Sequence, residues 1–121
     1  MITNFEEITQ ELSEDEMNLI TPICEGLKLR TDKNPIKAPD IVKGMNTFLE
    51  KSGSKIKMTE VKLRKCVNYI RANSILPVIA TSKGYYVSYD NEVLKDQIES
   101  LNERARSIKS CADGLESFLK F

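Results

Sequence analysis

The chain has 121 residues, of which 40% are hydrophobic and 30% are charged, and its 18 basic residues balance its 18 acidic residues. It contains no His, which excludes Ser-His-Asp and Cys-His catalytic arrangements and His-ligated zinc, so we expect a non-enzymatic protein without catalytic residues, metal or cofactor. The apolar stretches are short and the first ten residues lack a leader pattern, so we expect no membrane partner and a cytoplasmic location.

The balanced net charge conceals a segregation of charge along the chain. Residues 1–27 carry seven acids and no base (−7), residues 28–83 carry 13 bases and four acids (+9), and residues 84–121 carry five bases and seven acids (−2). The strongly basic middle indicates a polyanionic partner. We divide the chain into an acidic arm (1–11), a folded domain (12–90) and a C-terminal helix (91–121).

The domain begins with a helix start signal. Ser13 followed by Glu16 is the pattern of a capping box, in which each side chain binds the backbone N–H of the other residue. Apolar residues continue at helical spacing to Leu27, with Pro22 inside the run. We therefore expect one helix, kinked near Thr21, followed by a loop over residues 28–37.

Two further helices follow. Pro39 suits a first helical position, and apolar residues recur at helical spacing up to Glu50, which predicts a second helix with a short extended lead-in at 36–38. Thr59 can cap a third helix over 60–73. Its buried face should comprise Leu63, Cys66, Val67 and Ile70.

A hairpin over residues 76–89 is predicted next. Two runs of β-prone residues flank Thr81-Ser82-Lys83-Gly84, with Gly84 expected at the turn with positive φ. Tyr85, Tyr86 and Tyr89 could stack on bases, but alternation on a hairpin favours a role in the core.

The C-terminal part has an apolar residue at every fourth and third position in turn. The set is Leu94, Ile98, Leu101, Ala105, Ile108, Ala112, Leu115 and Leu119. Such a seam can fold back on the domain or pair with a second copy, and we favour a homodimer through a coiled coil of undetermined orientation.

Three helices and a two-stranded hairpin, in that order, are the elements of a winged helix-turn-helix, an α+β and mostly helical fold. In that fold the third helix enters the major groove and the hairpin reaches the flanking backbone. The candidate base-reading residues are Val61, Lys62, Arg64, Lys65, Asn68 and Tyr69. The candidate phosphate contacts are Lys55, Lys57, Thr59, Arg71 and Lys83.

The stretch LRKCVNYIR at residues 63–71 and the stretch LPVIATSKGYYV at residues 76–87 resemble the recognition helix and wing of small winged-helix proteins encoded by bacteriophages and prophages. The likeness extends to residues 12–26 and to the helix after Asn91. It implies a DNA-binding fold in a phage gene, acting in transcription regulation or in replication inside the bacterial host.

The leading functional hypothesis is binding of double-stranded DNA without catalysis. A dimer would then recognise a palindrome whose half-sites lie about one helical turn of DNA, or a multiple of it, apart. The alternative is a protein-interaction module that uses the winged helix or the acidic N-terminal segment to bind a host or phage protein.

Overall fold

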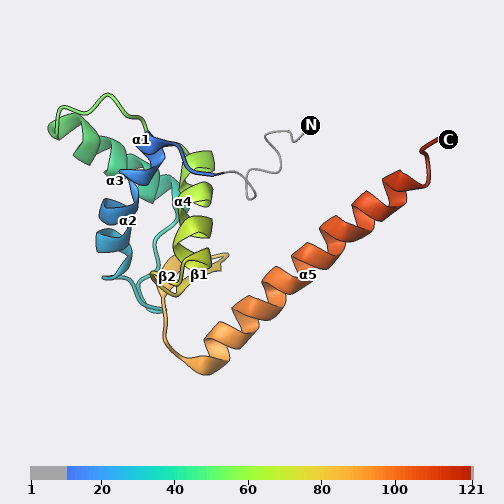
Figure 1. Cartoon of the computed structure of the whole chain (residues 1–121). Helices are drawn as coiled ribbons and strands as arrows, with labels where there is room; N and C mark the ends of the chain where they lie inside the picture. The colour runs from blue at the N-terminus through green and yellow to red at the C-terminus, as the bar shows by residue number, and fades with distance from the viewer. Residues whose placement is uncertain (1–10, 121) are drawn as a thin grey trace. The chain divides into compact units, whose positions relative to one another are not determined.

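The computed structural model describes residues 11–120, and the chain divides after Ser88 into two compact units. The predicted α+β class is confirmed: the chain is mostly helical, with one antiparallel hairpin and a long C-terminal helix (Figure 1). The acidic arm lies outside the described residues except for Glu11.

The first helical segment is two helices, α1 (Glu14–Met17) and α2 (Ile20–Leu27). The capping box is confirmed, since Ser13 Oγ accepts from Glu16 N–H at 3.2 Å and Glu16 Oε1 accepts from Ser13 N–H at 2.9 Å. The prediction of one helix kinked near Thr21 is wrong, because the break comes earlier, between Met17 and Ile20. Pro22 thereby falls in the first turn of α2, where its missing N–H leaves no hydrogen bond unmade.

The next two helices are α3 (Ala38–Lys51) and α4 (Glu60–Ala72). Pro39 lies in the first turn of α3, and the Thr59 hydroxyl caps α4 by accepting from Lys62 N–H at 3.2 Å, as predicted. Helix α4 ends one residue before the predicted Asn73. Beyond it Ser74 takes a positive φ of 54°, and the Ile75 N–H donates to the carbonyl of Ile70 at 2.9 Å, which closes the helix end.

The hairpin is confirmed and is shorter than predicted. Strand β1 (Val78–Thr81) pairs antiparallel with β2 (Gly84–Val87), with Val78 opposite Val87. Ile36 forms an isolated bridge to Tyr85 on β2. The Ile36 N–H donates to the Tyr85 carbonyl at 2.9 Å, and the Tyr85 N–H donates to the Ile36 carbonyl at 2.7 Å. Gly84 has a φ of +128°, and a Cβ there would lie 2.6 Å from the Ile36 carbonyl carbon.

One hydrophobic core joins the helices of the first unit to the hairpin. The predicted stripe on α4 is confirmed, since Leu63, Cys66 and Ile70 have no exposed surface and Val67 is 2% exposed. Helix α4 contacts α1, α3 and β1, and β2 contacts α2. In Figure 1 the hairpin lies at the C-terminal end of α4.

The second unit is α5 (Asn91–Glu116), a helix of 26 residues. Asp90 caps it, with Oδ1 accepting from Glu92 N–H at 2.8 Å and from Val93 N–H at 3.4 Å. None of its residues is buried within the single chain. The helix was predicted to reach 121 and stops at Glu116, so Leu119 lies beyond it and does not continue the helical seam.

Candidate nucleic-acid interface

The outward stripe of α4 comprises Val61, Arg64 and Asn68, which follow one another at helical spacing on the side opposite the core. Val61 is 41% exposed, Arg64 is exposed and Asn68 is half-buried. Among the described residues, the guanidinium of Arg64 has neither an ion pair nor a hydrogen-bond partner. The stripe therefore offers a free cation, an amide and an apolar side chain, the groups that read base edges in a major groove.

Lys65 was predicted to be an exposed base reader, and this prediction of exposure is wrong. Its side chain is 13% exposed, and its Nζ donates to both carboxylate oxygens of Glu16, at 2.8 and 3.0 Å. Glu16 is itself only 6% exposed. Because α1 packs against α4, the lysine stem folds back over α4 toward the capping box instead of extending into solvent.

The carboxylate of Glu16 is held ionised. Burial raises its pKa, but the hydrogen bonds from Lys65 and from the backbone of Ser13 and the nearby Lys65 charge lower it by more, so the net pKa lies below the ordinary value of 4.5. Beneath this pair the thiol of Cys66 donates to the Glu16 carbonyl at 3.8 Å. Burial, and to a lesser extent the negative charge of Glu16, raise the pKa of the Cys66 thiol to about 11. The thiol therefore stays protonated near neutral pH, as expected for a cysteine with a packing role.

The start of α4 is fixed by a residue that the sequence did not single out. Asn46, on α3, donates through Nδ2 to the carbonyl of Met58 at 3.2 Å and accepts from the Met58 N–H at 2.7 Å. Lys62 Nζ donates to the carbonyl of Lys57 at 2.8 Å, and so is half-buried against this segment. The sequence does show Asn46 as a polar residue inside an amphipathic helix. It does not show that Asn46 bonds Met58, because Met58 lies outside that helix.

Two other candidates on α4 also have internal partners. Arg71, predicted to contact phosphate, donates through Nε to the carbonyl of Val78 at 2.9 Å and so ties the helix to the hairpin. Tyr69 packs against the core with part of its ring exposed. Together with Asn68, Tyr69 lines a hollow of about 420 Å³ that Leu12 and Glu11 border on the α1 side.

The remaining phosphate candidates lie outside α4, in the segment before it and in the hairpin. Lys55 and Lys57 are exposed in the segment that precedes α4, and Lys83 is exposed in the turn of the hairpin. The Thr59 hydroxyl is used as the cap. Of the hairpin tyrosines, Tyr86 is buried at 8% exposure, Tyr85 is half-buried against the core and Tyr89 is 75% exposed.

The predicted seam residues lie on α5 up to Leu115. Leu94 and Leu101 are half-buried, whereas Ile98, Ile108 and Leu115 are 55%, 52% and 71% exposed, and Ala105 and Ala112 are exposed. Leu119, past the helix end, is 60% exposed. The single chain thus leaves an apolar stripe uncovered on α5.

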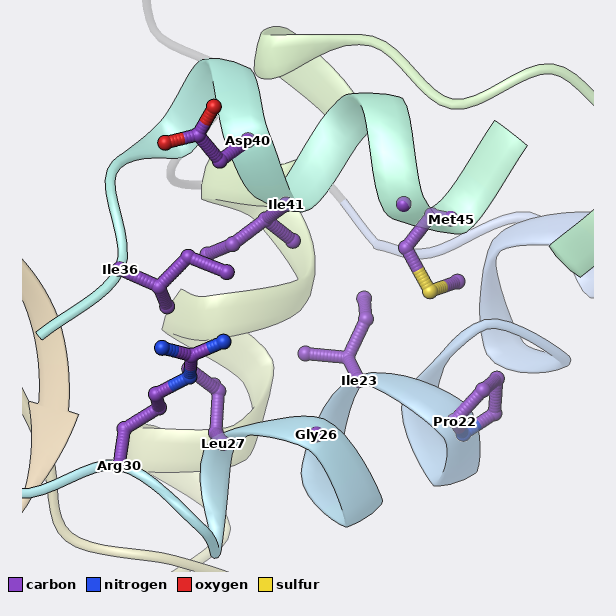
Figure 2. A pocket seen from close by; sticks show the side chains of 10 residues that line it. Pro22, Ile23, Gly26, Leu27, Arg30, Ile36, Asp40, Ile41 and Met45 are labelled. Atoms are coloured by element: carbon purple, nitrogen blue, oxygen red, sulfur yellow. The ribbon is translucent and has the colours of Figure 1, made fainter. Parts of the chain in front are cut away.

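A second concave feature lies between α2 and α3, apart from the outward stripe. It is a cavity of about 160 Å³ lined mainly by apolar residues, among them Ile23, Leu27, Ile41 and Met45 (Figure 2). Arg30 and Asp40 stand at one end, where Arg30 donates to Asn34 Oδ1 at 3.1 Å. The cavity brings together no nucleophile with a base.

The described residues contain no cluster of His, Cys, Asp and Glu that could hold a metal ion. No helix within residues 11–120 is both long and apolar enough to cross a membrane. Comparison with known proteins adds no relative, since no family model matches the chain and neither the curated proteins nor the solved structures gave a significant match.

Proposed function

We propose that residues 12–90 form a winged helix-turn-helix domain that binds double-stranded DNA. Helix α4 would lie in the major groove and the β1–β2 hairpin on the flanking backbone. The observation that carries the proposal is the outward stripe of α4, where Arg64 stands exposed between Val61 and Asn68 without an internal partner among the described residues.

The surroundings of the stripe support this orientation. Lys57 is exposed just before α4, and Lys83 is exposed in the turn of the hairpin, which lies at the C-terminal end of α4 (Figure 1), so the elements at both ends of α4 carry exposed positive charge. Residues 28–83 carry a net charge of +9, which suits a polyphosphate backbone. Arg71 supports the wing through the Val78 carbonyl, which orients the hairpin relative to α4.

We propose a smaller set of base-reading residues than the sequence predicted. Lys65 is paired with Glu16, Lys62 is bonded to the Lys57 carbonyl, and Tyr69 packs on the core. We assign base readout to Val61, Arg64 and Asn68. Arg64 suits guanine, Asn68 suits adenine, and Val61 suits the methyl group of thymine. As the sequence predicted, we further propose that two chains pair through α5.

The test is fluorescence anisotropy of the full chain with a random-sequence duplex over a range of salt concentrations. We expect a slope of log affinity against log salt that corresponds to roughly 4–8 phosphates. Arg64→Ala should weaken binding, whereas the control Arg106→Ala removes the same charge from the other compact unit and should leave it unchanged. Lys83→Ala should lower the slope by about one ion, as expected for a phosphate contact.

Two results would contradict the proposal. One is the absence of binding at low salt, which would favour the alternative of a protein partner. The other is equal weakening by Arg64→Ala and Arg106→Ala, since a nonspecific charge effect does not depend on the stripe. Lys65→Met provides an internal check. If Lys65 serves the fold, this change should lower the stability of the domain and leave the slope of log affinity against log salt unchanged.

A further inference from the structure

The seam on α5 can be written as heptad positions, and these decide how two copies can pair. Spacing of four and three residues in turn places Ile98, Ala105 and Ala112 at position a and Leu94, Leu101, Ile108 and Leu115 at position d. The flanking g positions then hold Gln97, Arg104 and Cys111. The flanking e positions hold Lys95, Asn102, Lys109 and Glu116.

A parallel pair suits these residues poorly. Position a would then face position a, so Ala105 would meet Ala105 and Ala112 would meet Ala112, which leaves two thin layers near the middle and the end of the core. Position g of one helix would also approach the next e of its partner, which brings Arg104 toward Lys109 on both sides. Asp90 could approach Lys95, but its carboxylate already caps the helix.

An antiparallel pair matches large residues with small ones. If the two-fold axis passes between Arg106 and Ser107, position a faces position d, so Leu101 meets Ala112 and Ala105 meets Ile108. The outer layers pair Ile98 with Leu115. Each layer then has either one large and one small side chain or two large ones, and no layer consists of two alanines.

The charges flanking the seam favour the same register. In an antiparallel pair e faces e and g faces g, which places Lys95 against Glu116 and Asn102 against Lys109 on each side, while Arg104 faces the neutral Cys111. A shift by one heptad in one direction would oppose Lys95 to Lys109 and Arg104 to Arg104. A shift in the other direction would oppose Lys109 to Lys109. Only the central register opposes unlike charges without a like-charged pair.

We propose that α5 binds a second copy of this chain as an antiparallel coiled coil, with its two-fold axis between Arg106 and Ser107. The inference rests on the pairing proposed above and does not depend on DNA binding. Lys109 keeps its 2.7 Å ion pair with Asp113 on its own helix in this arrangement. The two Asn91 residues, and with them the first residues of the two helices, then lie about 45 Å apart along the coil.

Spin labels on the full chain, measured without DNA at about 50 micromolar, test the orientation. In a Cys111→Ser background, Ser107→Cys reports pairing of either orientation and should give a short distance. Glu92→Cys reports the orientation: the antiparallel pair predicts about 45 Å and a parallel pair under about 25 Å. A short distance at residue 92, or no dipolar signal at residue 107, would overturn the inference, while loss of DNA binding alone would not.

Charge reversal tests the register independently. Glu116→Lys would oppose Lys95 and should weaken the dimer about tenfold, because two attractive pairs become repulsive. Adding Lys95→Glu should restore it. Glu103→Lys makes the same charge change at an outer helix position and serves as the control. Equal weakening by Glu116→Lys and Glu103→Lys, or no rescue by the double change, would contradict the register.

Discussion

Lys65 and Glu16 form an ion pair with two hydrogen bonds, at 2.8 and 3.0 Å, between a helix-capping carboxylate and the helix proposed to read DNA. Both side chains are nearly removed from solvent, at 13% and 8% exposure. The pair therefore links α1 to α4 and leaves Lys65 bonded inside the protein instead of exposed beside the outward stripe. Its consequences concern stability more than recognition.

We expect the two partners to be unequal in importance. Lys65→Met keeps the stem but leaves a buried carboxylate without its cation, and should destabilise the domain by about 3 kcal/mol. Glu16→Gln should cost less, about 1–2 kcal/mol, because the freed lysine can reach water. Urea unfolding followed by circular dichroism measures both. The double variant should lose less than the sum of the two, and strict additivity would show that the pair is not coupled.

The exposed pair Lys28 and Glu25 is the matched comparison for this cycle. Its atoms lie 3.3 Å apart with side chains 54% and 66% exposed. Lys28→Met should change the free energy of unfolding by less than about 0.5 kcal/mol. If Lys28→Met lowered the free energy of unfolding as much as Lys65→Met, burial would not explain the contribution of the Lys65–Glu16 pair.

Acid should remove the contribution of Glu16. Its pKa in the folded chain lies below the ordinary value of 4.5, so the carboxylate adds stability above that value and loses it as the pH falls through the folded pKa. We expect the stability difference between wild type and Glu16→Gln to be full near pH 7 and to shrink below about pH 4.5. A difference that stays constant or grows as the pH falls would contradict the lowered pKa. Urea unfolding at matched pH values provides the measurement.

The sequence predicted what depends on neighbouring residues. The capping box, the Thr59 cap, the buried stripe of α4 and the turn at Gly84 all follow from spacings of a few residues. The sequence placed the interruption of the first helix near Thr21, too late in the chain. The apolar residues keep helical spacing across the true break between Met17 and Ile20, so the pattern does not reveal it. The partners of Lys65 and Arg71 were missed because a lysine or arginine on a surface stripe looks free until another element covers it.

Gly84 should tolerate no side chain. Its φ of +128° disfavours other residues, and a Cβ would lie 2.6 Å from both backbone atoms of the Ile36 carbonyl. Gly84→Ala should cost about 2–4 kcal/mol in the free energy of unfolding. The control is Gly44→Ala in the middle of α3, where a Cβ meets nothing within 4 Å, and it should stabilise by about 0.5–1 kcal/mol. Equal effects of the two changes would show that the contact at Ile36 is not rigid.

The three cysteines should differ in reactivity. Cys111 is exposed on α5, whereas Cys24 and Cys66 are buried and burial raises the pKa of both thiols. In a thiol titration of the native protein at about pH 8, we expect Cys111 to react quickly and the other two only after unfolding. Fast modification of Cys66 in the native protein would contradict its packing beneath Glu16. Cys111→Ser identifies the fast thiol.

The bridge between Ile36 and Tyr85 links segments about 50 residues apart in sequence, and a short hairpin by itself is barely stable. The hairpin therefore gains this part of its support only after the loop before α3 has been brought to β2. Closing so long a loop is costly until the helices have packed, so we expect the wing to form late in folding, with mutations at the bridge changing the unfolding rate more than the folding rate. We therefore expect the element proposed to contact the DNA backbone to be among the last parts of the domain to order and among the first to be released.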